Sequence, residues 1–385
     1  MPAPTRSIVD RMKSRAACGG NSLSHGLCRD SSLKEGAFAL FKVFPEVITM
    51  SHTQYIDGYK SKLDLRQTQQ AIKVIKDTFQ VLLAQNLHLE RVTAPVLVTA
   101  DSGINDDLSG VERKVSFSVK EMDEQHAEVV QSLAKWKRVA LGRYGFQPGE
   151  GIYTDMNAIR RDDDMDNTHS IFVDQWDWEA VITPDRRTVE YLQKIVRRIV
   201  KAIADTNKLL QQKYPLLTFE INEEVTFITA NELAVMYPHL SGKEREDAIT
   251  RERGTVFLMG IGEPLADGKP HDSRAPDYDD WTLNGDLLIW NETLGHALEI
   301  SSMGIRVDAV ALARQLAAAG AEERMKYPYH KAIAEGKLPL TIGGGIGQSR
   351  LCMLMLEKAH IGEVQVSIWP HEMVEDCEKH GVILL

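Results

Sequence analysis

The chain has 385 residues, of which 43% are apolar, and a formal net charge of −10. This length and apolar content allow a sizeable core in one large domain or in two. The acidic balance argues against a nucleic-acid-binding surface as the main function, because phosphate contacts need a basic face. No apolar run approaches the roughly 20 residues that cross a bilayer, so no membrane partner is expected.

The first 49 residues differ in composition from the rest of the chain. They are rich in Ser, Gly, Ala and Arg, lack sustained periodicity and precede a second methionine, Met50. We expect residues 1–49 to be a disordered extension and residues 50–385 to form a single folded domain. Basic residues outnumber acidic ones here, which leaves organelle targeting open, but a transit peptide normally has fewer acidic residues. The four cysteines show neither C-x-x-C nor zinc spacing, so we expect a cytoplasmic, reduced protein.

The folded part begins with apolar residues at helical spacing, which predict a long amphipathic helix over residues 54–85. A strand is expected next, over residues 89–98, although it contains Pro95. Proline lacks the N–H that a central strand uses, so this strand should lie at a sheet edge or at an interface. Helix and strand together favour a dimer-forming element, and an edge strand on a monomer fits about equally well.

Periodicity and capping predict the remaining elements. Helices are expected near residues 131–141, from Thr183-Pro184 onward, and over residues 231–236 and 242–251. Asp308 should cap a further helix. Strands are expected over residues 152–159, 170–179, 218–228, 255–261, 285–290, 298–306 and 364–369. No internal repeats are evident after residue 50.

The strand over residues 170–179 has an unusual polar face. Alternation places Gln175, Asp177 and Glu179 on one side, which is odd for a core strand and typical of a binding floor. The charged connection before it begins at Arg160, and a solvated loop would explain that connection as well. Asp106 lies in a polar loop, residues 99–110, whose composition is explained largely by turn chemistry.

Two carboxylates on strands expected to be neighbours suggest a cation site. Asp286 and Glu299 offer oxygen ligands of the kind that hard cations prefer, although an exposed polar strand face is an equal alternative. Simple alternation over residues 298–306 places Glu299 with Ser301 on one face and Ser302 with Arg306 on the other.

The glycine-rich stretch TIGGGIGQSRL, residues 341–351, predicts a strand that runs through glycines into a helix. The dinucleotide pattern G-x-G-x-x-G fails, because Gln348 or Arg350 stands where the third glycine is required, and no lysine follows for a phosphate loop. Glycines allow close approach to the backbone, and arginine offers a planar fork for phosphate. The stretch therefore indicates a nucleotide site, with close packing at a strand-to-helix turn as the alternative.

These segments together resemble a known family. Pro95, Arg160 with residues 170–179, and Gly343–Arg350 match in order the three motifs of class II aminoacyl-tRNA synthetase catalytic domains. The segments NDDLSG (105–110), SLAKWK (132–137), VDQWDWE (173–179), RAPDYDDW (274–281), LNGD (283–286) and SSMGIRVD (301–308) resemble more closely the ammonia-dependent asparagine synthetases, or aspartate–ammonia ligases. The resemblance covers about residues 50–385.

The resemblance implies an α+β fold, with a mainly antiparallel sheet flanked by helices, and a homodimer formed through the first motif. It implies that aspartate, ATP and ammonia give asparagine, AMP and pyrophosphate through a β-aspartyl-adenylate, with Mg²⁺ and without tRNA. The expected catalytic residues are Arg160, Asp106 and Arg350. The expected aspartate site comprises Asp106, Ser132, Lys137, Gln175, Asp177, Ser302 and Arg306. The expected ATP site comprises Arg160, Asp279, Glu299, Ser301, Gly343, Gly345, Gly347 and Arg350, with Asp286 and Glu299 as metal ligands.

Two other functions remain open on the sequence. An aspartyl- or asparaginyl-tRNA synthetase would need an anticodon-binding domain, and nothing basic or barrel-like precedes the catalytic segments. A catalytically silent relative would have no reason to retain Arg160, Glu299 and Arg350 together. No N-terminal cysteine nucleophile is present, so ammonia is the expected nitrogen donor rather than glutamine.

Overall fold

The computed structural model describes residues 53–106, 108 and 112–385. Contacts divide the chain after Thr49, and all described residues belong to the second unit, Met50–Leu385. The expected disordered extension lies outside the described residues, so it stays a prediction, as does the division into domains. No helix in the described ranges is long and apolar enough to cross a membrane.

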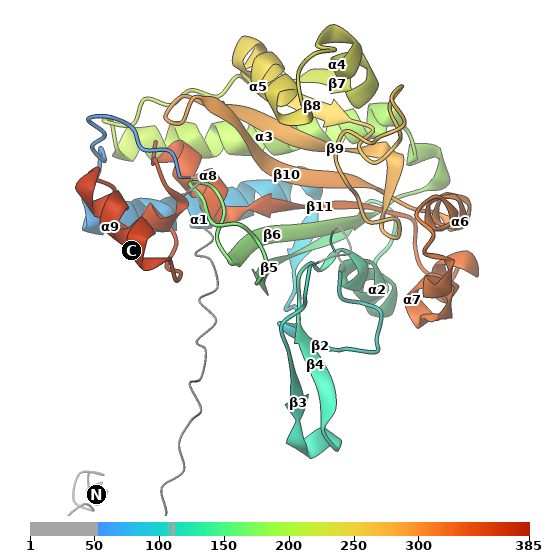
Figure 1. The fold of residues 1–385 in the computed structure, drawn as a ribbon. Helices are drawn as coiled ribbons and strands as arrows, with labels where there is room; N and C mark the ends of the chain where they lie inside the picture. Colours follow the sequence, from blue (N-terminus) through green and yellow to red (C-terminus); the bar gives the residue numbers. More distant parts are fainter. Residues whose placement is uncertain (1–52, 107, 109–111) are drawn as a thin grey trace, which may run out of the picture. The chain divides into compact units, whose positions relative to one another are not determined.

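A mixed eight-stranded sheet forms the centre of the second unit (Figure 1). The six inner strands pair antiparallel, whereas β1 and β7 at the two edges pair parallel with their neighbours. The strands in spatial order are β1 (Leu89–Arg91), β5 (Gly151–Ile159), β6 (Phe172–Val181), β11 (Thr341–Gly347), β10 (His296–Arg306), β9 (Asp279–Asn291), β8 (Thr255–Met259) and β7 (Thr226–Thr229). The expected α+β fold with a mainly antiparallel sheet is confirmed.

A smaller sheet projects from the main body (Figure 1). Its three strands pair antiparallel, in the order β2 (Leu97–Thr99), β4 (Gln125–Val129) and β3 (Ser116–Val119). The short 3₁₀ helix η1 (Lys120–Met122) lies in the connection from β3 to β4.

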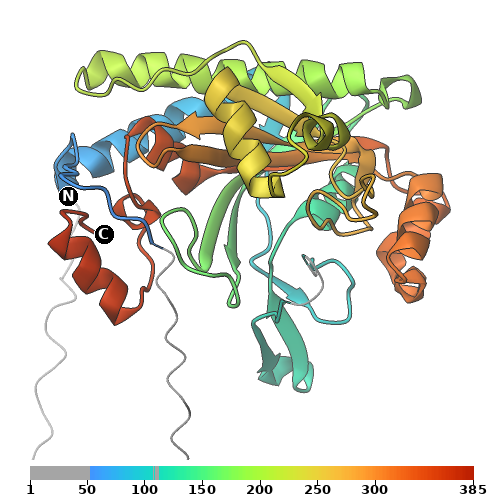
Figure 2. The same ribbon diagram turned by 45° about the horizontal axis from the view of Figure 1, so that its top comes forward.

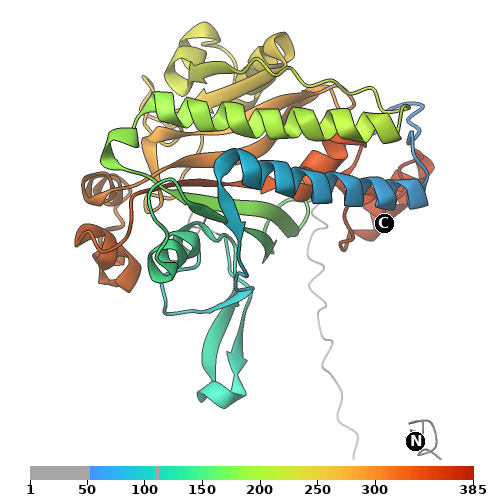
Figure 3. The same ribbon diagram turned by 180° about the vertical axis from the view of Figure 1, so that it is seen from behind.

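Two long helices, α1 (Leu65–Leu87) and α3 (Val189–Lys213), lie side by side on one face of the large sheet (Figure 3). Their apolar stripes meet Trp176 and Trp178 of β6 in the main core, as expected for amphipathic helices that cover a sheet. The other helices are α2 (Ala134–Tyr144), α4 (Ala230–Met236), α5 (Gly242–Arg253), α6 (Ala309–Ala318), α7 (Pro328–Ala334), α8 (Gln348–Met355) and α9 (His371–Lys379). Short 3₁₀ helices are η2 (Pro184–Arg186), η3 (Glu322–Lys326) and η4 (Ile361–Glu363).

Several predicted boundaries are wrong. The first helix begins at Leu65, because Asp64 forms a capping box with Gln67 there. Thr183-Pro184 opens only the 3₁₀ helix η2, and Thr188 caps the long helix instead. The strand predicted over residues 89–98 is two strands in two different sheets, with Pro95 between them. Residues 364–369 form no strand.

A β-bulge in β10 overturns the alternation expected for that strand. Glu299 pairs with Leu288, but Ser301 already pairs with Leu287, so one extra residue is accommodated between them. Glu299 and Ser302 therefore share the face opposite α1 and α3, whereas Ser301 lies beside Ile346 and Leu287 of the main core. The expected grouping of Glu299 with Ser301 is wrong.

His360, just before η4, makes the stability of the fold sensitive to pH. Its Nδ1 accepts a hydrogen bond from the Gly362 N–H at 3.0 Å, and the ring meets Trp369 edge-on at 4.8 Å. Burial lowers its pKa from 6.5 to about 4, against a smaller opposing effect of Asp166. Between these two values the unfolded chain binds more protons than the folded chain, so stability falls as the pH falls through this window.

We expect wild-type protein to lose about 2 kcal/mol more unfolding free energy between pH 7 and pH 5 than His360→Asn. Asparagine can keep the acceptor for Gly362 but does not titrate. Urea unfolding followed by tryptophan fluorescence at fixed protein concentration measures the difference. Equal losses in the two proteins would contradict the prediction.

Candidate active site

A polar cavity of about 480 Å³, called the front cavity below, opens on the sheet face opposite α1 and α3. It is lined by β6, β10 and β11, by the connection between β5 and β6, and by the segment before β9. On this face α5 packs against β9 and β10 (Figure 2). The predicted site residues that line the cavity are Arg160, Gln175, Glu299, Ser302, Gly345, Gly347 and Arg350.

Arg160 and Arg350, two of the three arginines that line the front cavity, are held mainly by neutral groups. Arg350, in the first turn of α8, donates to the Glu299 carbonyl at 3.0 Å, and its other terminal nitrogen lies 2.7 Å from His169 Nε2. Arg160 donates to the Gln131 carbonyl through two nitrogens at 3.3 and 3.4 Å. The nearest carboxylate oxygen of Glu299 is 3.8 Å from Arg350. Both positive charges therefore remain largely available to an anionic ligand.

Asp286 of β9 and Glu299 of β10 form a carboxylate pair, in which Asp286 is buried and the half-exposed Glu299 lines the cavity. Burial and the Glu299 charge raise the pKa of Asp286, although Arg274 opposes them. The pKa of Glu299 is lowered, because Arg350 and Arg274 outweigh the effect of burial. Arg274 forms an ion pair with one Asp286 oxygen, and the other, Oδ1, has no hydrogen-bond partner. In the part of the chain described, no group of three or more His, Cys, Asp or Glu side chains is arranged as a metal site.

Gln175, Asp177 and Glu179 share one face of β6, as alternation predicted, but only Gln175 of the three lines the front cavity, so the binding floor stays a prediction. Asp177 forms an ion pair with Lys137 of α2, and Lys137 also donates to the Gly344 carbonyl at 3.0 Å. Glu179 accepts two hydrogen bonds from Arg306 Nε, at 2.9 and 3.1 Å, and one from Nη2 at 2.7 Å. Burial alone would raise the pKa of Glu179, but Arg306 more than offsets it and the pKa is lowered.

Nine of the residues expected to contact ligands are not among those that line the front cavity: Asp106, Ser132, Lys137, Asp177, Asp279, Asp286, Ser301, Arg306 and Gly343. Asp279, expected at the ATP site, is buried and pairs with Arg306. Ser301 lies on the helix-covered face, because of the bulge. Ser132 lies at the start of α2, where its hydroxyl accepts a hydrogen bond from the Ala134 N–H at 3.1 Å. Asp279 and Ser301 are both buried outside the cavity lining, so their assignment to the ATP site stays a prediction that this geometry does not support.

Asp106 is buried, and Leu108 of the same loop lines the front cavity. The Asp106 Oδ1 accepts from the Leu108 N–H at 3.1 Å, whereas its Oδ2 is buried without a partner. Burial raises the pKa of Asp106, and the charge of Lys135 opposes that rise. Burial, and to a smaller extent the Asp106 charge, raises the pKa of Tyr278, which lines the cavity. The Asp106 carboxyl therefore binds a proton more tightly than an exposed aspartate does, and it lies near residues that line the front cavity.

Two glycines of β11 are explained by close packing against β6. A Cβ on Gly343 would lie 2.0 Å from a Glu179 carboxylate oxygen, and one on Gly345 would lie 2.2 Å from the Gln175 amide oxygen. Gly345 and Gly347 also line the front cavity, but Gly343 does not. The close-packing and nucleotide interpretations of this stretch are thus compatible.

Two residues important in this geometry were not among the predicted site residues. Arg274 lines the cavity and contacts Asp286, and Glu179 orients Arg306. Glu179 could have been selected from the alternation of β6, since it follows Gln175 and Asp177 on the same face. Arg274 lies in a loop without periodicity, so its contact with Asp286 depends on tertiary structure.

Comparison with known proteins points to one enzyme family. A family model described as aspartate-ammonia ligase matches residues 66–381. The aspartate–ammonia ligase of Clostridium tetani is 58% identical over 85% of this chain and 96% of its own length. That of Lactobacillus johnsonii is 55% identical over 85% of this chain and 98% of its own.

Solved structures with a similar fold include two asparaginyl-tRNA synthetases complexed with asparaginyl-adenylate. The Pyrococcus horikoshii enzyme has a TM-score of 0.57 at 18% identity, over 79% of this chain and 70% of its own. The Entamoeba histolytica enzyme has a TM-score of 0.56 at 17% identity, over 78% of this chain and 66% of its own.

These neighbours define the fold as that of class II aminoacyl-tRNA synthetase catalytic domains, as the three motifs predicted. Within that class, the chain belongs to the aspartate–ammonia ligase family. The resemblance seen in the sequence is confirmed.

Proposed function

We propose that the front cavity catalyses ATP-dependent synthesis of L-asparagine from L-aspartate and ammonia through a β-aspartyl-adenylate, releasing AMP and pyrophosphate. The observation that carries this proposal is the pair Arg160 and Arg350, which are held mainly by neutral groups in one cavity with Gln175 of β6. Family membership supports the same reaction.

In the first step, the β-carboxylate of aspartate attacks the α-phosphorus of ATP. Two anions must meet, so positive charge has to be in place before the reaction. Arg160 is assigned to the α-phosphate and the attacking oxygen, and Arg350 to the γ-phosphate. Gly345 and Gly347 leave room for the adenine against the backbone, since both line the cavity.

Asp286 and Glu299 are the proposed Mg²⁺ ligands. The unpartnered Oδ1 of Asp286 and the nearby Glu299 carboxylate fit the requirement for oxygen ligands. Mg²⁺ commonly uses one or two carboxylates together with substrate phosphates, so two protein ligands are sufficient. When bound, the ion would neutralise charge that develops on the leaving pyrophosphate.

The aspartate substrate is assigned to the floor formed by β6 and its partners. Gln175 and Asp177, with Asp106, are the proposed partners of the α-ammonium group. Lys137 and Arg306 are candidates for the carboxylates, with Ser302 assisting. Both cations already contact protein carboxylates, but each has more N–H donors than these contacts use. Ser132 is assigned a supporting role at the start of α2.

In the second step, ammonia attacks the acyl carbon of the adenylate. Ammonium has no lone pair, so a base near the acyl carbon is needed at neutral pH. Asp106 is the proposed base, because its pKa is raised by burial beside the cavity. Asp177 is the proposed second carboxylate behind it.

The protein is proposed to act as a cytoplasmic homodimer. Helix α1 and the edge strand β1 correspond to the first class II motif, and β1 leaves one strand edge unpaired in the described chain. Light scattering coupled to gel filtration would give a dimer mass under this proposal, and a monomer mass would refute it.

The function is tested with purified full-length protein, ATP, Mg²⁺, aspartate and ammonium, in the absence of tRNA. Asparagine and pyrophosphate should appear in equal amounts, and omission of aspartate or ammonium should abolish asparagine. A requirement for tRNA would favour the synthetase alternative. Absence of asparagine under all these conditions would refute the proposal.

A further inference from the structure

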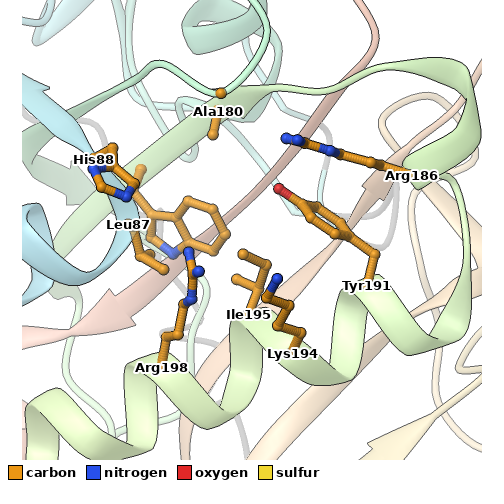
Figure 4. Close-up of a pocket in the computed structure, with 10 residues that line it drawn as sticks. Leu87, His88, Ala180, Arg186, Tyr191, Lys194, Ile195 and Arg198 are labelled. Carbon is orange, nitrogen blue, oxygen red and sulfur yellow. The ribbon is translucent and has the colours of Figure 1, made fainter.

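A second cavity lies on the opposite side of the large sheet, between β6 and helix α3. It has a volume of about 290 Å³ and is called the back cavity below. Leu87, Ala180 and Ile195 supply apolar wall. Figure 4 shows Tyr191, Lys194, Ile195 and Arg198 rising from one helix, with Arg186 and His88 approaching from other segments.

The charged groups around the back cavity are cationic. Arg186, Lys194 and Arg198 line it, and no Asp or Glu is among the described residues of its wall. Within the described ranges none of these three side chains forms an ion pair with a carboxylate. Arg186 lies over the Tyr191 ring at 5.5 Å, and Arg198 donates to the Asn86 carbonyl at 3.3 Å. Most of their N–H donors are therefore available to an acceptor.

Trp178 provides an independent indication of a ligand. Its side chain lines the back cavity and has 0% exposure, and its indole Nε1–H has no hydrogen-bond partner. A buried indole N–H normally has an acceptor, because an unpaired buried donor costs about 1–3 kcal/mol. The cavity thus combines an unused buried donor, three cations and an apolar wall, and an organic anion would complement all three.

We propose that the back cavity binds a small organic anion. Its carboxylate or phosphate group would contact Arg186, Lys194 and Arg198 and accept a hydrogen bond from Trp178, with charge-assisted bonds supplying most of the specificity. The apolar body would pack against Leu87 and Ile195. Since Trp178 lies between Asp177 and Glu179 in β6, this ligand binds directly behind the floor of the front cavity, but without using its arginines.

The Trp178 indole signal in the intact, ¹⁵N-tryptophan-labelled protein reports directly on this site. We expect it to shift saturably on titration with benzoate or phenyl phosphate, at least tenfold more tightly than with inorganic phosphate, because only the first two carry an apolar body. The tighter of the two organic probes identifies the preferred anionic group. Trp178→Phe assigns the signal, and the rise in Tm that each probe causes in wild-type protein gives a second readout that does not need this variant.

Matched variants separate the back cavity from the front one. Arg198→Gln and Lys194→Gln should each weaken binding at least tenfold. Lys208→Gln, on the exposed face of the same helix and paired with Glu223, should not change it. Binding should also persist in Arg350→Ala. The proposal is overturned if none of the three probes gives a saturable shift, if Arg198→Gln and Lys194→Gln bind normally, or if Arg350→Ala abolishes the shift.

Discussion

Arg350→Ala is expected to lower kcat for asparagine synthesis by about three orders of magnitude while the protein stays folded. Arginines that stabilise charge during phosphoryl chemistry contribute effects of this size. The loss should be one of catalysis and not of folding, because among the described residues Arg350 closely contacts only the carbonyls of Glu299 and Thr168 and the ring of His169. Within the same part of the chain, substitution of Arg350 breaks no close ion pair, because the nearest carboxylate oxygen, that of Glu299, is 3.8 Å away.

Three further variants make the measurement specific. Arg160→Ala should show a loss similar to that of Arg350→Ala. Arg350→Lys keeps the charge but loses the planar fork, so its kcat should fall between wild type and alanine. Arg314→Ala, which removes an exposed arginine paired with Glu263, should retain wild-type kcat. A kcat of Arg350→Ala within tenfold of wild type, with an unchanged circular dichroism spectrum, would exclude the assigned role.

The success of the sequence prediction depended on short-range patterns. The polar face of β6 follows from strict alternation, and β6 has no bulge that would disturb it. The glycines of β11 and the following Arg350 are contiguous, so their placement needs no knowledge of distant contacts. The fold class followed because these patterns occur in the order of the three class II motifs.

The failures have physical causes that a local pattern does not contain. One extra residue in β10 moves Ser301 to the core face and brings Glu299 to the face of Asp286. The resemblance implied that Asp279 contacts ATP, yet its carboxylate pairs with the buried Arg306. A bulge and a buried ion pair are both decided by tertiary packing, because neither is favourable without its neighbours.

Asp106→Asn should separate the two steps of the reaction. At saturating aspartate and ATP, we expect asparagine formation to fall by about 10³-fold, whereas aspartate-dependent ATP–pyrophosphate exchange changes by less than about fivefold. The range for general-base catalysis, about 10²–10⁴-fold, sets the size of this loss. Asparagine can still accept the hydrogen bond from the Leu108 N–H that Asp106 Oδ1 now receives, so the loop should keep its structure.

Hydroxylamine provides the decisive control, because it is largely unprotonated at neutral pH and needs little help from a base. Aspartyl hydroxamate should therefore form at a near wild-type rate in Asp106→Asn, and Asp101→Asn, an exposed change in the same loop, should affect neither product. Since burial raises the pKa of Asp106, wild-type asparagine synthesis should also decline as the pH falls towards that raised value, while the exchange reaction does not. If Asp106→Asn made asparagine at the normal rate, or lost exchange and hydroxamate formation equally, Asp106 would act in aspartate binding rather than as the base.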